Sequence, residues 1–86
     1  MGTYKLINIT DKENNIKTEA LEHYAKKHPE LTGYIYDLDV KQSLYFRWIG
    51  GGLLITSRVE KYTLNKSDIL EVVTANSIYT FHKINN

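Results

Sequence analysis

Three consecutive glycines at residues 50–52 lie between two runs rich in aromatic and β-branched residues. The first run covers residues 43–49 and the second covers residues 53–57. Glycine adopts positive φ without steric cost, so the glycines predict a tight turn that joins two antiparallel strands. This stretch also holds the chain's only tryptophan, Trp48. We therefore expect the hairpin to lie at the centre of the sheet.

The chain has 86 residues and no cysteine. This length fits one domain over residues 1–86, whose core must be stable without disulfides or thiolate metal sites. Eleven basic and ten acidic residues leave a net charge of +1, which supplies no whole-molecule attraction to phosphate. No apolar run approaches the roughly 18–20 residues of a membrane-spanning helix, and the N-terminus lacks a signal-peptide pattern. We expect a cytoplasmic protein without membrane contact.

A single helix is predicted over residues 19–28. Its less polar residues recur at the i, i+3, i+4, i+7 spacing that places them on one face, namely Leu21, Tyr24, Ala25 and His28. The Thr18 hydroxyl is expected to cap the first turn by accepting a hydrogen bond from a free amide. Pro29 disfavours helical geometry at the residue before it, so the helix should end there.

The remaining chain reads as strands separated by polar turns. Besides the two strands of the glycine hairpin, strands are predicted over residues 4–10, 34–38, 69–75 and 78–84. The second hairpin strand is expected to continue over residues 58–64 after a bend or bulge near Thr56 and Ser57. The last two should pair across a two-residue turn at Asn76 and Ser77. The predicted fold class is α+β, with one short helix packed on an antiparallel, meander-like sheet.

Both faces of the predicted sheet carry apolar or aromatic residues. Alternation along the first hairpin strand places Leu44, Phe46 and Trp48 on one face, and Tyr45, Arg47 and Ile49 on the other. One ten-residue helix cannot cover two such faces. Two explanations stay open: the sheet curls into a small barrel that encloses one face, or the second face is buried against another chain.

No pattern in the chain identifies a catalytic or metal site. His23 and His28 are five residues apart on the predicted helix, so they point about 140° apart and cannot hold one metal ion together. Asp37 and Asp39 could share a strand face, but this spacing is common at solvated strand ends. The three glycines lack the following helix and the lysine of a phosphate-binding loop. We expect no enzymatic activity, no cofactor and no metal.

Tyrosine, tryptophan and arginine are the residue types that dominate protein interfaces. The predicted partner-binding set lies on the outward face of the hairpin and its continuation, and comprises Tyr45, Arg47, Ile49, Leu54, Arg58 and Tyr62. The same aromatic and basic residues could instead stack bases and follow the backbone of single-stranded nucleic acid, although Glu60 and Glu71 interleave with them. A third alternative is a homodimer that buries this face.

Parts of the sequence resemble small phage early proteins. The strand at residues 4–10, the helix start at residues 18–25 and the hairpin ending at residues 73–81 carry this resemblance. It implies a short accessory protein of a phage or mobile element. Such proteins often bind and block a host enzyme or defence complex, including CRISPR effectors. The resemblance assigns no functional residue.

Overall fold

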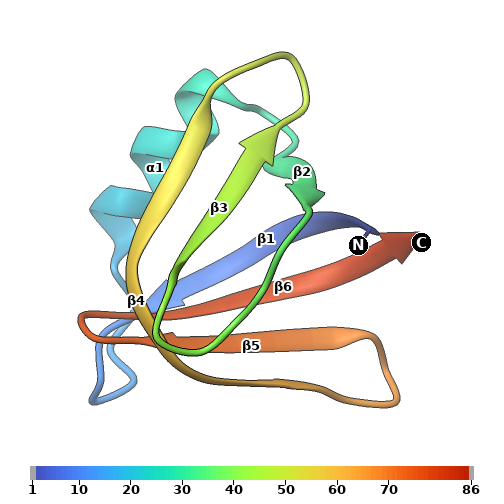
Figure 1. Cartoon of the computed structure of the whole chain (residues 1–86). Coiled ribbons are helices and arrows are strands. Elements are labelled where there is room, and N and C mark those ends of the chain that lie inside the picture. The colour runs from blue at the N-terminus through green and yellow to red at the C-terminus, as the bar shows by residue number, and fades with distance from the viewer. Residues whose placement is uncertain (1, 86) are drawn as a thin grey trace.

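Six antiparallel strands and one helix make up most of residues 2–85, the part of the chain that the computed structural model describes (Figure 1). In chain order they are β1 (Gly2–Thr10), α1 (Thr18–Lys27), β2 (Thr32–Ile35), β3 (Ser43–Trp48), β4 (Leu53–Leu64), β5 (Ile69–Thr74) and β6 (Ile78–Asn85). The predicted α+β class and antiparallel sheet are confirmed. β2 lies earlier in the chain than predicted, over Thr32–Ile35 instead of residues 34–38.

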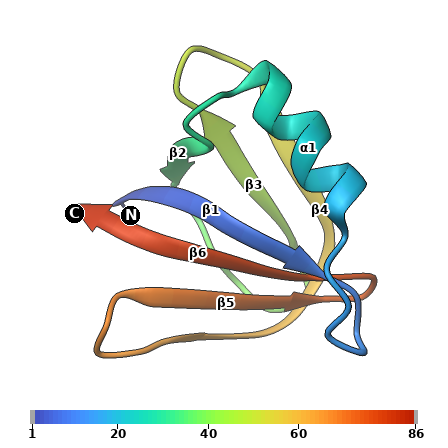
Figure 2. The same ribbon diagram turned by 180° about the vertical axis from the view of Figure 1, so that it is seen from behind.

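The sheet is closed, because its last strand pairs with its first. Each strand pairs with the next along the chain, and β6 pairs with β1. The first and last strands therefore lie side by side, as both views show (Figures 1 and 2). In such an order no strand is central, so the prediction that the glycine hairpin occupies the centre of the sheet is wrong.

The glycine turn is confirmed. Gly50, Gly51 and Gly52 have φ values of 95°, 111° and 94°, a region that side chains rarely allow. The Trp48 N–H donates to the Gly52 carbonyl over 3.0 Å, and the Gly51 N–H donates to the Trp48 carbonyl over 3.1 Å. These bonds close the loop between β3 and β4.

The residues on the inner side of the closed sheet form one core. Its most buried members are Leu6, Ile9, Leu44, Phe46, Trp48, Val59, Leu70, Val72 and Phe81. Phe46 lies at its middle, with ring centroids 4.9 Å from both Trp48 and Phe81. Because Phe46 comes from β3 and Phe81 from β6, this contact spans the interior. The predicted alternation of β3 is confirmed, since Tyr45 and Arg47 are exposed.

Helix α1 covers one end of this core. Its Ala20, Leu21 and Tyr24 side chains pack against the buried residues, and the Tyr24 ring lies 5.5 Å from that of Trp48. The His28 ring, just after the helix, stacks on Trp48 at 4.2 Å. Within residues 2–85 no helix is long and apolar enough to cross a membrane.

The helix starts and ends one residue earlier than predicted. Thr18 is its first residue, and Lys17 occupies the N-cap position without a side-chain capping bond. The predicted Thr18 cap is therefore wrong. The reason is tertiary: the Lys17 N–H donates to the Ile9 carbonyl over 2.8 Å, which holds the chain against β1 until Thr18. The helix ends at Lys27, ahead of Pro29, as proline requires.

The turn between β5 and β6 is also displaced by one residue. The Thr74 N–H donates to the Ser77 carbonyl over 2.8 Å, and the Thr74 Oγ1 accepts from the Ser77 N–H over 3.1 Å. These bonds pair Thr74 with Ser77, which is buried, so the two turn residues are Ala75 and Asn76. The predicted turn at Asn76 and Ser77 is wrong because the Thr74 side chain extends the ladder.

Alanine substitutions at Gly33 and Gly51 should distinguish the loss of stability caused by a steric clash from the loss caused by a positive φ. A Cβ at Gly33 would collide with the Arg47 carbonyl and lie 2.9 Å from the Phe46 Cζ, whereas one at Gly51 would meet nothing within 4 Å. We expect Gly51→Ala to cost about 1–2 kcal/mol through its positive φ, and Gly33→Ala to cost about 3 kcal/mol or more through overpacking. Urea unfolding measures both. Equal losses would contradict the close approach of β2 and β3.

Candidate functional site

The register of β2, β3 and β4 brings exposed side chains together on the outer side of the sheet. Tyr34 pairs with Arg47, Arg47 pairs with Leu53, and Tyr45 pairs with Ile55. We call these five residues the outer patch. Each is exposed, so aromatic and aliphatic side chains surround one guanidinium group across three neighbouring strands.

Helix α1 leaves the outer patch uncovered. The helix contacts Trp48, whose side chain points to the inner side of β3. It lies behind β4 in Figure 1 and in front of β4 in the reverse view (Figure 2). The ion pair formed within residues 2–85 joins Lys12 and Glu60, so Arg47 has no acidic partner in the described chain. A partner could therefore reach its guanidinium directly.

The structure brings together some of the predicted site residues. Tyr45 and Arg47 belong to the outer patch. Arg58 is exposed and pairs with Ser43, which places it on the same side of the sheet, beyond Tyr45. Ile49 is half exposed and follows β3, where its N–H donates to the Thr32 carbonyl over 3.0 Å. These four residues remain candidates for a contact.

The predicted outward placement of Leu54 is wrong. Leu54 pairs with Phe46 and is only 4% exposed, whereas Leu53 is 48% exposed. The cause is the length of the glycine loop. A two-residue turn at Gly50 and Gly51 would set Leu54 opposite Arg47, but the longer loop sets Leu53 there, and a shift of one residue reverses every side chain of a strand.

Tyr62 also lies elsewhere than predicted. It is 42% exposed, but it pairs with the buried Val72 and so points to the inner side of the sheet. Its ring lines a cavity together with Tyr4 and Tyr36. Tyr62 is therefore separate from the outer patch.

Sequence reasoning missed three members of the outer patch, namely Tyr34, Leu53 and Ile55. Leu53 and Ile55 alternate with Leu54 and Thr56, so the sequence shows that they share a face. It does not show which face meets solvent, because this depends on the loop length. Tyr34 joins the patch only through the pairing of β2 with β3, which no local pattern reveals.

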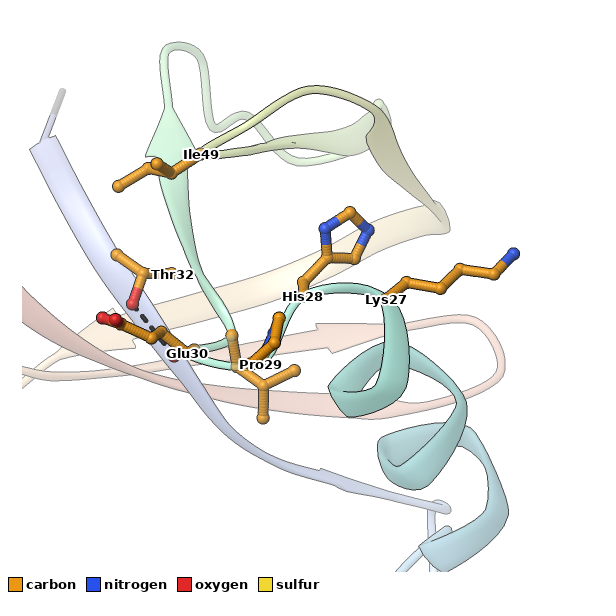
Figure 3. Close-up of a pocket in the computed structure, with 7 residues that line it drawn as sticks. Lys27, His28, Pro29, Glu30, Thr32 and Ile49 are labelled. Carbon is orange, nitrogen blue, oxygen red and sulfur yellow. Dashed lines mark hydrogen bonds between the residues drawn. The ribbon is translucent and has the colours of Figure 1, made fainter.

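A shallow cavity of about 240 Å³ lies beside Ile49, at the end of α1 (Figure 3). Residues 27–32 form the rest of its wall. The Thr32 hydroxyl donates to the Glu30 carbonyl over 2.9 Å, and the His28 ring is stacked on Trp48. Within residues 2–85 no three His, Cys, Asp or Glu side chains gather to hold a metal ion.

Two tyrosine phenols have perturbed ionisation, that of the buried Tyr4 and that of the partly buried Tyr79. Burial raises the pKa of Tyr79, and the nearby Tyr24 adds to the rise. Burial also raises the pKa of Tyr4, with a further contribution from the negative charge of Asp68. In both cases the folded protein favours the neutral phenol. Neither group lies in the outer patch, so these shifts do not bear on a contact made there.

The raised pKa of Tyr79 predicts a loss of stability in alkali. The unfolded chain ionises this phenol near the ordinary value of about 10, whereas the folded chain resists ionisation, so the free energy of unfolding falls as the pH rises above that value. We expect this fall to be shallower in Tyr79→Phe. Urea unfolding at a series of pH values measures it. Parallel curves for the two proteins would contradict the burial of this phenol.

Substitutions of Leu53 and Leu54 test which side chains of β4 point into the core and which point to solvent. Leu54→Ala removes a buried side chain and should cost about 2–5 kcal/mol. Leu53→Ala truncates a half-exposed side chain and should cost less than about 1 kcal/mol. Urea unfolding compares the two variants directly. The reverse order would mean that the register across the glycine loop is shifted by one residue.

The assignment of the outer patch depends on the residues of this chain alone. Its five members come from three strands and share exposure, a common face and direct pairing. Comparison with protein-family models, with curated proteins and with solved structures finds no match for this chain.

Proposed function

We propose that this chain is a small, non-enzymatic binding protein that contacts another protein through the outer patch. The observation that carries the proposal is the pairing of exposed Tyr34, Arg47 and Leu53 across three strands that no helix covers. The closed sheet acts as a small barrel scaffold that holds these side chains in fixed positions.

The chemistry of the outer patch favours a protein partner. Aromatic residues and arginine are enriched at interfaces and supply most of their binding energy. Arg47 lies between Tyr34 and Leu53, so a docked partner would exclude water around its guanidinium. A carboxylate on the partner would then form a charge-assisted hydrogen bond with it. Arg58 extends the positive charge along the same side.

The biological setting follows from the resemblance to small phage early proteins. We propose that the partner is a host protein, such as a defence effector of the CRISPR type, and that the chain inhibits or modulates it in the host cytoplasm. Inhibition by binding needs no catalytic group. A rigid patch of aromatic and aliphatic residues around one arginine is sufficient for such a contact.

A pull-down from bacterial lysate, with and without nuclease, tests this proposal. We expect a discrete protein to be retained after nuclease treatment by the wild-type chain. Arg47→Glu should weaken its binding by roughly thirtyfold or more, as for a central interface arginine. Lys5→Glu is the matched control, because Lys5 is an exposed cation on β1 and its reversal should leave binding unchanged.

The other outcomes distinguish the alternatives. Equal retention by both charge-reversal variants would contradict a contact through the outer patch. Loss of all binding after nuclease would favour single-stranded nucleic acid, for which the exposed Tyr34 and Tyr36 rings, 6.1 Å apart, offer a stacking surface. Light scattering over a concentration series would detect a homodimer that buries the patch.

A further inference from the structure

A second cavity, of about 260 Å³, lies where β4 continues beyond its pairing with β3. Three tyrosines and one aspartate line it, namely Tyr4, Tyr36, Asp37 and Tyr62. We call it the tyrosine cavity. Its apolar wall consists of Ile35, Leu38, Leu64 and Leu70. Figure 1 shows the connection between β2 and β3, which supplies Tyr36, Asp37 and Leu38.

The end of that connection is anchored to β4. The Lys41 N–H donates to the Val59 carbonyl over 2.7 Å, and the Val59 N–H donates to the Gln42 carbonyl over 2.9 Å. Leu38 packs partly buried against the core. The segment that carries Tyr36 and Asp37 is therefore held at β2, at Leu38 and at β4, which fixes one wall of the cavity.

Three tyrosine rings line the cavity without packing on one another. Of these three rings, Tyr4 contacts Phe81 and Tyr36 contacts Tyr34, and no ring contact within residues 2–85 joins any two of Tyr4, Tyr36 and Tyr62. Tyr36 and Tyr62 are 56% and 42% exposed. The space between them is therefore not filled by ring stacking and is open to a group from solvent. Aromatic ring faces carry negative electrostatic potential.

The charged groups around the cavity are negative, which is also the sign of the electrostatic potential at aromatic ring faces. Among residues 2–85, Asp37 is the charged residue of the lining, and no basic side chain of this range lines the cavity. The negative charge of Asp68 also acts on Tyr4. Lys83 is the strand partner of Tyr4 but does not belong to the lining. A cation in the cavity would thus lie among tyrosine side chains and one carboxylate residue, whereas an anion would be repelled by the negative charge.

We propose that the tyrosine cavity binds an alkylammonium group, such as the methylated ammonium of a lysine side chain or of a small quaternary amine. Tyr36 and Tyr62 contribute cation–π contacts, and Asp37 contributes the opposite charge. The cavity is smaller than the roughly 300–1,000 Å³ of pockets that enclose a whole small molecule, so it accepts a head group. This inference does not depend on the proposed role of the outer patch.

Titration with choline, followed by NMR of the tyrosine ring protons, tests the proposal. We expect saturable shifts of the Tyr36 and Tyr62 signals at constant ionic strength. The matched control ligand is 3,3-dimethylbutanol, which has the shape of choline without its charge and should cause much weaker shifts. Equal affinity for the two ligands would overturn the cation–π assignment, and so would the absence of saturable shifts with choline.

Variants locate the site. Tyr62→Ala should weaken choline binding about fivefold or more because a ring face is lost, while Tyr62→Phe keeps the ring and should bind nearly as well as wild type. Asp37→Asn should weaken binding, and Ile7→Ala, which alters an exposed side chain on β1 outside the lining, should not. Amide spectra confirm folding. Full affinity in a folded Tyr62→Ala would overturn the proposed site.

A second ligand identifies the source of the ammonium group. A short peptide with one trimethyllysine is compared with choline and with the same peptide carrying unmodified lysine. Tighter binding of the trimethyllysine peptide than of choline would support the proposal and assign the site to a protein side chain. Equal binding of the two methylated ligands would support it and assign the site to small quaternary amines. Equal binding of both peptides would contradict recognition of the methylated group.

Discussion

The register between β3 and β4 decides which side chains enter the core and which meet solvent. Hydrophobicity alone would favour Leu53 and Ile55 inside, because the alternate face carries Leu54 and Thr56. The structure has the opposite arrangement. The length of the glycine loop determines that Leu54 and Thr56 point inward. Thr56 is satisfied there, because its buried hydroxyl accepts a hydrogen bond from the Leu44 N–H over 2.9 Å. The exposed leucine and isoleucine that result form part of the outer patch.

Closure of the pairing through β1 and β6 explains why the outer patch is left without cover. An open sheet would have two edge strands with unpaired backbone groups, and here the first and last strands satisfy each other. The interior is filled by Phe46, Phe81 and Trp48, and α1 packs at one end. Within residues 2–85 no further element covers the outer side of β2, β3 and β4, so its apolar residues stay exposed.

Local chemistry in the sequence predicts the elements well, and long-range contacts account for the errors. The glycine turn, the helix stop before Pro29 and the alternation of β3 depend on residues close in sequence, and all are confirmed. The predicted Thr18 cap is wrong because the Lys17 N–H is hydrogen-bonded to the Ile9 carbonyl on β1. Leu54 is misplaced because the glycine loop is one residue longer than a two-residue turn. Tyr62 is misplaced because the pairing of β4 with β5 is irregular between Val59 and Lys61, and one extra residue there reverses the face of the side chains that follow.

The outer patch and the tyrosine cavity meet at one pair of rings. Tyr34 belongs to the patch, Tyr36 lines the cavity, and their rings are stacked at 6.1 Å. Residues two apart on a strand share a face, but β2 ends at Ile35, which leaves the Tyr36 ring free to border both surfaces. A protein that covers Tyr34 and Arg47 therefore also reaches the rim of the cavity. A methylated lysine side chain on such a partner would extend the contact from the patch into the cavity, and both surfaces would then contribute to the binding of one partner.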